Sequence, residues 1–568
     1  MAAQFNNQRF AERKTLSSDS QNQDSQCLFY SPGTGIYSSK HPPMQLPTDP
    51  FLDVVSFIFS HSHHGCSALI DSSTGSSIPY SQLFPLVKSM AFGLRELGIS
   101  KGDVILILLP NSIYFPIVVL GVLYLGAIVA PMNPLSSFSE IKKQTIDCRV
   151  CLAFATTGNV NKLKELGVKA IEVPEYVKTG DEVNDRDTFW RLISYNHESI
   201  FRPPITQDDV AAIMNSSGTT GSSKSVVLVH RNFIAMVELF VRFEASQYRE
   251  EISWENVYLA VVPMFHIYGL SLFVMGLLSL GTSIVVMRKF DINQAVRAIE
   301  KYNVSHFPLV PLILAALTAK AKRAVGGSSL RSLKQVSCGA AALTKRVIED
   351  FVHGLPHVDF IQGYGMTETT AVGTRGFNVG MVRKHTSIGL LAPNMQAKVV
   401  DCNTGSCMPP GKAGELWLRG PAVMKGYLND WKATTSAIEK DGWLHTGDII
   451  YFDHDGYLYI VDRLKDIIKY KGFQIAPADL EAVLLSHPDI LDAAVTGVPD
   501  EEAGEVPVAF VVKSPESMLS QDAIIKHVAN QVAAYKKVRR VVFVPTIQKS
   551  PTGKVLRRQL RHLCTSKI

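Results

Sequence analysis

Between residues 50 and 440, short apolar runs alternate with segments in which apolar positions recur at helical spacing. Examples of the apolar runs are Val210–Met214, 257–264 and 282–290. A strand that is apolar at nearly every position is typical of a parallel sheet covered by helices on both faces. The pattern therefore predicts an α/β fold whose large N-terminal body contains several subdomains with mostly parallel sheets.

The segment Ile113–Met132 is uncharged and long enough to raise the question of a membrane-spanning helix. It is better divided, because the strand-like run Val104–Leu109 precedes it and Pro110-Asn111-Ser112 is typical of a helix start. Gly126 then comes before a second strand-like run, Ala127–Pro131. We expect a buried strand–helix–strand unit, in a protein that is not integral to a membrane.

The pattern changes near residue 440. The strand-like runs 449–453 and 457–462 flank His454-Asp455-Gly456, and Asp-Gly between such runs predicts a hairpin with a two-residue turn. Counting outward from that turn, Asp448 and Arg463 are partners at the open end, about 5 Å apart between Cα atoms. The pair is either a cross-strand ion pair or a carboxylate that holds ribose hydroxyls beside a guanidinium.

Beyond the hairpin, the elements are short and mixed. Pro477 begins an amphipathic helix, strand-like runs follow at 493–499 and 507–513, and a final helix starts after Gln521. This order predicts a small α+β C-terminal domain of about 100 residues, a common domain size.

These patterns divide the chain into three parts. Residues 1–45 are rich in Ser, Gln and Asn, which is typical of a flexible extension. We expect residues 46–464 to form the large domain and 465–568 to form a small mobile domain, with a hinge at Lys465.

Composition narrows the classes of function. A net charge of +6 over 568 residues fits an anionic small substrate but not the clustered basic face that nucleic-acid binding needs. Eight cysteines are too sparse for a disulfide framework and indicate a reducing compartment. Cys148 and Cys151 are expected to be ordinary buried thiols, because a second ligand pair for zinc is not evident. The first twenty residues contain no apolar segment typical of a secretory signal.

Two loops follow predicted strands and carry candidate chemistry. The loop 216–224, SSGTTGSSK, combines glycines, hydroxyls and one lysine, which suits a polyphosphate, although an ordinary turn has a similar composition. It is not a Walker A motif, because Ser223 stands where the second glycine is required. The loop 362–369, QGYGMTET, follows the strand Val358–Ile361, and its Glu368 could bind Mg²⁺ beside nucleotide phosphates.

Seven segments, in this order, resemble the adenylate-forming superfamily, and most closely the plant 4-coumarate–CoA ligases and their relatives. The resemblance covers about residues 50 to 560. It implies a ligase that joins a carboxylic acid to CoA through an acyl-adenylate, with ATP and CoA as co-substrates and Mg²⁺ as cofactor. The segments are SSGTTGSSK (216–224), PMFHIYG (263–269), QGYGMTE (362–368), GELWLRGPAVMKGY (414–427), GWLHTGD (442–448), DRLKDIIKYKGFQ (462–474) and SPTGK (550–554).

The resemblance also implies roles for individual residues. Thr367 would contact the α-phosphate of ATP and Glu368 would bind the magnesium ion. The implied ATP-binding residues are Ser216, Ser217, Gly218, Thr219, Thr220, Gly221, Lys224, Asp448, Arg463 and Lys554. The implied acyl-adenylate-binding residues are His266, Tyr268, Leu272, Ala340, Gln362, Gly363, Met366, Thr367, Lys465, Lys469 and Gln474.

Two half-reactions follow from the resemblance. Lys554 would stabilise the transition state in which the carboxylate attacks the α-phosphate, beside His266. The small domain would then rotate about Lys465, removing Lys554 and bringing Lys469 to the site where the CoA thiol attacks. The implied CoA-binding residues are Lys289, Lys471 and Gly472.

The acyl pocket departs from the pattern of hydroxycinnamate-specific members. Leu272 stands where a serine is usual and Ala371 where a proline is usual, whereas Tyr268, Ala340 and Gly363 agree. Leu272 is expected to make the pocket floor more apolar, which favours an alkyl chain over a phenol. The expected substrate is thus a hydroxycinnamate, fatty or oxylipin-type acid.

Alternatives remain for the acceptor and the compartment. A carrier-protein ligase or a luciferase-like oxygenase would share the same motifs. The terminal Ser566-Lys567-Ile568 differs from the peroxisomal signal Ser-Lys-Leu in one residue, so a peroxisomal enzyme that binds the import receptor is expected, with the cytoplasm as the fallback.

Overall fold

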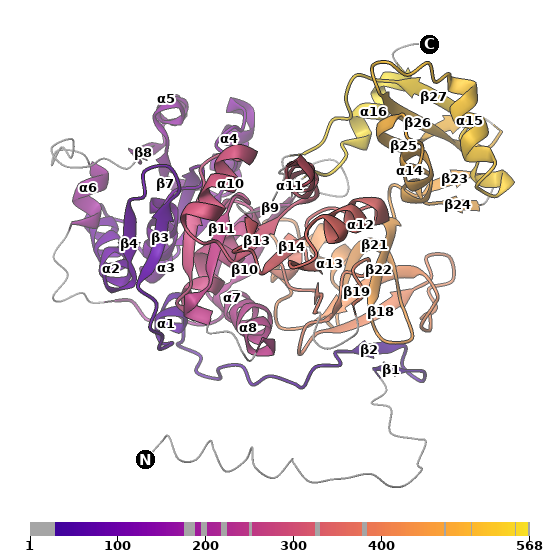
Figure 1. Ribbon diagram of the computed structural model, residues 1–568. Helices are drawn as coiled ribbons and strands as arrows, with labels where there is room; N and C mark the ends of the chain where they lie inside the picture. Colours follow the sequence, from indigo (N-terminus) through magenta and orange to yellow (C-terminus); the bar gives the residue numbers. More distant parts are fainter. Residues whose placement is uncertain are drawn as a thin grey trace, which may run out of the picture.

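The computed structural model describes residues 29–174, 188–194, 202–216, 224–248, 253–323, 330–377, 383–470, 473–500, 502–550 and 553–565. Figure 1 shows a large body and, at the upper right in yellow, a small domain formed by the C-terminal part of the chain. Three sheets belong to the body and one to the small domain. The expected α/β architecture is confirmed.

The first sheet of the body has the strand order β20-β10-β9-β6-β5-β7-β8. Its strands are parallel from β9 to β8, whereas β10 pairs antiparallel with β9 and β20. The strands are β5 (Val104–Leu108), β6 (Ile128–Pro131), β7 (Val150–Ala155), β8 (Lys169–Glu172), β9 (Val210–Ser216), β10 (Lys224–Val229) and β20 (Gly426–Tyr427).

The second sheet has the order β17-β16-β15-β14-β13-β11-β12-β3-β4. It is parallel from β15 to β3 and antiparallel at its two edges. The strands are β3 (Ser67–Asp71), β4 (Ser77–Pro79), β11 (Val257–Ala260), β12 (Ser283–Val286), β13 (His306–Leu309), β14 (Gln335–Cys338), β15 (Asp359–Tyr364), β16 (Thr374–Arg375) and β17 (Leu390–Leu391).

The uncharged segment Ile113–Met132 belongs to a strand–helix–strand unit, as expected, and contains its helix and second strand. Helix α3 (Tyr114–Tyr124) connects β5 to β6 and is buried from Tyr114 to Leu123. A helix that is apolar on all sides must be covered on all sides, and α3 contacts α1, α2 and η5. Among the described residues, we find no helix with the length and apolarity that crossing a membrane requires.

The other helical segments of the body cover these sheets or connect their strands (Figure 1). Two of them, η3 and η5, are π-helices that pack against each other. The segments are α1 (Val54–Phe59), α2 (Tyr80–Glu96), α4 (Phe138–Asp147), α5 (Thr157–Glu165), α6 (Thr188–Ile193), α7 (His230–Met236), η3 (Val237–Arg242), α8 (Phe243–Gln247), η4 (Ser253–Glu255), α9 (Ile267–Gly269), η5 (Leu270–Gly276), η6 (Leu277–Leu280), α10 (Ile292–Lys301), α11 (Pro311–Arg323), α12 (Lys345–Gly354), η8 (Thr367–Thr369) and α13 (Trp431–Ala437).

The third sheet is antiparallel throughout, a feature that the sequence pattern revealed only at its hairpin. Its order is β1-β2-β18-β19-β21-β22, so that the N-terminal segment forms one edge. The strands are β1 (Tyr30–Ser31), β2 (Ile36–Ser38), β18 (Gln396–Val400), β19 (Gly414–Arg419), β21 (Leu444–Phe452) and β22 (Leu458–Arg463).

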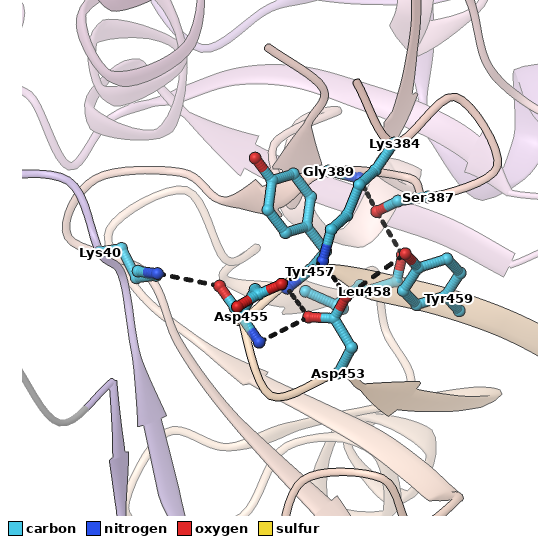
Figure 2. A network of polar contacts seen from close by, with 9 residues as sticks. All are labelled: Lys40, Lys384, Ser387, Gly389, Asp453, Asp455, Tyr457, Leu458 and Tyr459. Atoms are coloured by element: carbon cyan, nitrogen blue, oxygen red, sulfur yellow. Dashed lines mark hydrogen bonds and ion pairs between the residues drawn. The ribbon is translucent and has the colours of Figure 1, made fainter. Parts of the chain in front are cut away.

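The predicted two-residue turn of the hairpin is wrong. Phe452 pairs with Leu458, so the connection spans residues 453–457. The side chain of Asp453 accepts hydrogen bonds from the backbone N–H groups of Asp455 and Tyr457, and Lys384 bridges the carboxylates of Asp453 and Asp455 (Figure 2). These polar contacts fix a longer turn than an Asp-Gly pair alone would form.

The small domain packs the helices α14, α15 and α16 against its own sheet, and its predicted elements are present. The helix that begins at Pro477 is α14, but the helix after Gln521 is not the last one, because α16 follows it. The elements are β23 (Ile468–Tyr470), β24 (Phe473–Ile475), α14 (Pro477–Leu485), β25 (Ile490–Asp500), β26 (Gly504–Lys513), α15 (Gln521–Ala529), η9 (Ala534–Lys536), β27 (Arg540–Phe543) and α16 (Arg557–Thr565). A separate apolar core includes Ile468, Leu480, Val511 and Ile524.

The two cysteines of the CxxC pair differ in burial. Cys148 is buried and Cys151 is exposed, so only the first behaves as expected. In the parts of the chain that the structure describes, no group of three or more His, Cys, Asp or Glu side chains is arranged to hold a metal ion.

Candidate active site

A cavity of about 570 Å³ lies where the sheets of the body meet the small domain. Its wall combines the ends of β9, β10 and β15 with residues of the β21–β22 hairpin. Lys554 of the small domain also lines it, and Figure 1 shows a yellow segment extending from that domain toward the body. The candidate residues that line the cavity are Ser216, Lys224, His266, Tyr268, Ala340, Gly363, Met366, Thr367, Glu368, Arg463, Lys465 and Lys554.

The phosphate-binding candidates lie where β9 ends and β10 begins. Ser216 and Lys224 are direct cross-strand partners, so the intervening loop starts and ends at the cavity. The candidates Ser217, Gly218, Thr219, Thr220 and Gly221 lie outside the described residues.

Lys224 is linked to the predicted magnesium ligand through an aromatic ring. Its Nζ lies 4.7 Å from the ring centroid of Tyr427, and the Tyr427 hydroxyl donates a hydrogen bond of 3.2 Å to Glu368 Oε1. Burial, and then the charge of Glu368, raises the pKa of Tyr427 above its usual value, which keeps that hydroxyl a neutral donor. A cation, a hydroxyl and a carboxylate therefore occupy one corner of the cavity.

Glu368 fits a magnesium ion that also binds phosphate oxygens. It follows β15 in the short helix η8, is buried at 6% exposure, and lines the cavity next to Thr367. Mg²⁺ in nucleotide sites is typically held by one or two carboxylates, with phosphate and water completing the shell. Among the described residues, the one side-chain partner of this carboxylate is the Tyr427 hydroxyl, which leaves oxygen lone pairs suited to that role.

Asp448 and Arg463 face each other across the hairpin, as counted from the sequence. Arg463 Nε lies 2.6 Å from Asp448 Oδ1, and the Tyr364 hydroxyl donates a hydrogen bond of 2.6 Å to Oδ2. Burial, and then the charge of Asp448, raises the pKa of Tyr364 well above its usual value. The carboxylate is thus held from both sides, and Asp448 itself does not line the cavity, whereas its partners Tyr364 and Arg463 do.

Burial and neighbouring charges shift the protonation of both Lys554 and His266. Burial, and then the charge of Arg463, lowers the pKa of Lys554 to about 8. Burial, and then the charge of Lys554, lowers the pKa of His266 to about 4, so the imidazole is neutral at pH 7. Its Nδ1 accepts a hydrogen bond from the backbone N–H of Tyr268, which leaves the ring proton on Nε2.

Two of the acyl-pocket candidates lie elsewhere. Leu272 does not line the large cavity but a second one of about 20 Å³, so it does not form the expected apolar floor. The Gln362 side chain is also outside the lining, because it donates a hydrogen bond of 2.7 Å to the backbone oxygen of His385.

The candidates for the second half-reaction are not gathered at the cavity. Lys469 is exposed on β23 and Lys289 is exposed beyond β12, and neither lines the cavity. Gln474 is the backbone partner of Lys469 in the β23–β24 pair. Lys471 and Gly472 lie outside the described residues.

The structure adds lining residues that sequence reasoning missed. Tyr364 lies within the QGYGMTE segment and Tyr427 ends the GELWLRGPAVMKGY segment, so their positions beside predicted site residues were a usable signal. Arg375 also lines the cavity, and the sequence offered no signal for it, because β16 is only two residues long.

The cavity therefore combines cationic, carboxylate and apolar parts. The family model described as AMP-binding enzyme matches residues 60–428. The chain belongs to the AMP-binding enzyme family. The model for the AMP-binding enzyme C-terminal domain matches residues 479–554 of this family member, within the small domain.

Relatives match the chain over nearly its full length. It is 59% identical to 4-coumarate--CoA ligase-like 6 from Arabidopsis thaliana, with 95% of each chain covered. It is 43% identical to Peroxisomal OPC-8:0-CoA ligase 1 from the same plant, over 93% of this chain and 96% of that protein. The solved ATP-bound MatB from Rhodopseudomonas palustris has the same fold, with a TM-score of 0.81 at 23% identity over 90% of this chain and 98% of that chain.

Proposed function

We propose that this AMP-binding enzyme is an acyl-CoA ligase that converts a carboxylic acid, ATP and CoA into an acyl-CoA, AMP and pyrophosphate. An acyl-adenylate is the intermediate. The observation that carries the proposal is the position of Lys554, which reaches from the small domain into a cavity otherwise lined by the body and the expected hinge residue Lys465. A lysine supplied by a separate domain can act in one step and be withdrawn before the next.

In the first step, a carboxylate oxygen of the acid attacks the α-phosphorus and the bond to the β-phosphate oxygen breaks. Lys554 is protonated below its pKa of about 8, so its positive charge can stabilise the negative charge that gathers on the α-phosphate. Thr367 is the hydroxyl donor to that phosphate, and Lys224 binds the departing pyrophosphate. Glu368 would hold Mg²⁺, which neutralises phosphate charge when bound.

In the same step, Asp448 accepts hydrogen bonds from the ribose hydroxyls and Arg463 keeps that carboxylate in place. His266 is neutral and contacts the reacting carboxylate through its Nε2 proton. A neutral donor can orient the anion without reducing its nucleophilicity as a cation would. The acyl chain then occupies the part of the cavity next to Tyr268, Ala340, Gly363 and Met366.

In the second step, the CoA thiol attacks the acyl carbon and AMP leaves. We propose that the small domain first rotates about Lys465, which withdraws Lys554 and brings Lys469 to the cavity. Lys469 is exposed and outside the cavity in this arrangement, which is the expected position before such a rotation. Lys289, Lys471 and Gly472 are the proposed CoA contacts.

The acid is proposed to be a hydroxycinnamate, fatty or oxylipin-type acid. The names of the relatives, with 4-coumarate and OPC-8:0 among them, support this range. A different acceptor, either a carrier protein or molecular oxygen in a luciferase-like reaction, is the alternative function. A peroxisomal location is proposed from Ser566-Lys567-Ile568 and is supported by the peroxisomal relative; masking the tail with a C-terminal fusion should leave the protein in the cytoplasm.

The proposal is tested by separating the half-reactions with cinnamic, medium-chain, long-chain and oxylipin acids. Acid-dependent pyrophosphate release tests adenylation, and CoA ester formation tests the acceptor. Lys554→Ala should stop pyrophosphate release and spare CoA ester formation from a supplied acyl-adenylate. Equal loss of both steps would contradict the division between the two domains, and pyrophosphate release without any CoA ester would favour the alternative acceptors.

A further inference from the structure

A buried arginine borders the inner part of the acyl pocket. Arg375 is 5% exposed, yet it lines the large cavity together with Tyr268 and Gly363. It lies on β16 directly opposite Gly363 of β15. Gly363 comes three residues before Met366 and four before Thr367, and all three residues line the cavity. Thr367, the proposed contact of the α-phosphate, lies along the same chain segment beyond the end of β15. Arg375 therefore faces the part of an acid that is remote from its carboxylate.

Gly363 lies against the side chain of Arg375. A Cβ placed on Gly363 would lie 3.5 Å from Arg375 Cδ and 3.8 Å from Nη1, so a larger side chain there would cover the arginine from the pocket side. On the opposite side, the ring of Phe240 in η3 lies 5.1 Å from Arg375 Cζ. The guanidinium thus contacts the aromatic ring of Phe240 and lies next to Gly363.

The hydrogen-bonding capacity of Arg375 is incompletely used. Its Nη2 lies 2.6 Å from Glu244 Oε1, whereas its Nε is buried and has no hydrogen-bond partner among the residues that the structure describes. A guanidinium has five donor hydrogens, and leaving one of them buried and unpaired is unfavourable. A ligand in the cavity cannot reach the buried Nε, but Nη1 lies beside Gly363 and also has no hydrogen-bond partner among the described residues, so an acceptor atom of a ligand would pair with it.

The positive charge of Arg375 is already balanced by Glu244, which limits the kind of hydrogen-bond acceptor that a bound acid can place beside it. Glu244 supplies the counter-charge, and the aromatic groups facing the arginine are neutral, because burial raises the pKa of Tyr268 to about 12 and lowers that of His306 to about 3. A second carboxylate on the substrate would be an uncompensated buried anion beside Glu244. A neutral oxygen is the acceptor that fits.

Resting on the proposed function, we propose that Arg375 is a specificity-determining residue that accepts acids with a neutral oxygen, a hydroxyl or a carbonyl, at the end remote from the carboxylate. Acids with a plain hydrocarbon end leave the arginine unpaired, and acids with a second carboxylate add an unbalanced charge. The wholly apolar pocket end expected from Leu272 is thereby replaced by a polar one, since Leu272 lies outside the pocket and Arg375 lies at it.

The competing explanation is a purely structural ion pair. Arg375 also borders the small cavity of about 20 Å³, whose lining includes Glu244, Tyr248 and Gln335, and such a cavity has room for one water molecule. If a water satisfied Nε from that side, Arg375 would hold Glu244 in place and would not discriminate between acids.

The test compares kcat/KM of the full chain for two matched sets of acids. One set is cinnamate, 4-coumarate and 4-carboxycinnamate, and the other is octanoate, 8-hydroxyoctanoate and octanedioate. In at least one set, the acid with the neutral oxygen should be preferred over both others on the order of tenfold or more, because an unpaired donor to a charged group is strongly disfavoured. The two sets distinguish a phenol oxygen from an alkyl oxygen.

The first variant is Arg375→Met, which leaves the Glu244 carboxylate without its ion-pair partner. The double variant Glu244→Gln with Arg375→Met removes both charges and is used if the single variant is unstable. Both should bring the preference within each set close to one, with the change mainly in KM and the hydrocarbon acid still ligated. A wild-type enzyme that uses all acids equally, or a preference that survives in a folded variant, would overturn the inference and leave the ligase function standing. Failure of every acid to release pyrophosphate would instead contradict the proposed function.

Discussion

Asp448 and Arg463 are cross-strand partners at the open end of the β21–β22 hairpin, with Asp448 Oδ1 and Arg463 Nε 2.6 Å apart. Asp448 is 3% exposed and its other oxygen accepts the Tyr364 hydroxyl, so the carboxylate has a fixed orientation behind Arg463 and Tyr364, which line the cavity. A charged pair held in this way is a positioning device as well as a contribution to stability.

Replacing Asp448 by Asn should therefore raise the KM for ATP on the order of tenfold while changing the KM for the acid little, because a hydrogen bond to a charged group contributes about 1.5–3 kcal/mol. Initial rates of pyrophosphate release over a range of ATP concentrations provide the measurement. The matched control is Asp455→Asn in the exposed turn of the same hairpin, where the side chain is 69% exposed and an effect within about 1 kcal/mol on stability is expected. Equal effects of both variants on ATP binding would contradict the ribose role.

The protonation of Lys554 predicts a limb in the pH profile of adenylation. The lysine is charged below its pKa of about 8 and loses that charge as the pH rises through it. Because the cation is the active form, kcat/KM for pyrophosphate release should be constant below about pH 7 and fall above pH 8. Lys554→Arg supplies a cation that does not titrate in this range, so any activity that it retains should lack the limb. An unchanged limb in that variant would assign it to another group.

The same two residues, Asp448 and Arg463, show why part of the site could be predicted from sequence. The turn is longer than the predicted Asp-Gly turn, and the prediction also lacked a bulge that follows Ile460. These two errors shift the strand register in opposite directions, so the predicted pairing of Asp448 with Arg463 is correct. Strand register over several residues is set by side-chain alternation, which a sequence displays, whereas the length of a turn depends on side-chain contacts such as those of Lys384.

Arg375 and Leu272 show why the rest could not be predicted. Arg375 reaches the pocket only because a two-residue strand pairs with Gly363, and such a short strand has no periodicity to detect. Leu272 lies in a π-helix, η5, where the side-chain directions differ from those of an α-helix, so an assignment carried over from related sequences placed it on the wrong wall. Both depend on tertiary packing and not on a local pattern.

Gly365 is predicted to be irreplaceable in the wall between β15 and η8. A Cβ at this position would lie 2.2 Å from the backbone oxygen of Ala371, which has a positive φ of 66° and little freedom to move. Gly365→Ala should lower stability by about 1–3 kcal/mol and reduce adenylation, since Thr367 would be displaced. Thermal unfolding is the measurement, with Gly354→Ala as the control: nothing lies within 4 Å of a Cβ there, at the end of α12, and the change should be neutral or stabilising. Equal stability of the two variants would contradict the steric argument.

Lys469 should have the opposite kinetic profile to Lys554. It is exposed on β23 and absent from the cavity lining, so Lys469→Ala removes nothing that contacts ATP in this arrangement of the domains. Acid-dependent pyrophosphate release should stay within about twofold of the wild-type rate, because exposed side chains away from a site contribute little. CoA ester formation from a supplied acyl-adenylate should fall at least tenfold, since the rotation about Lys465 would bring this cation to the reacting centre. Lys526→Ala on α15 is the control, because it removes an exposed lysine of the same domain and should affect neither step. Loss of pyrophosphate release in Lys469→Ala, or unchanged thioester formation, would show that this lysine does not exchange places with Lys554.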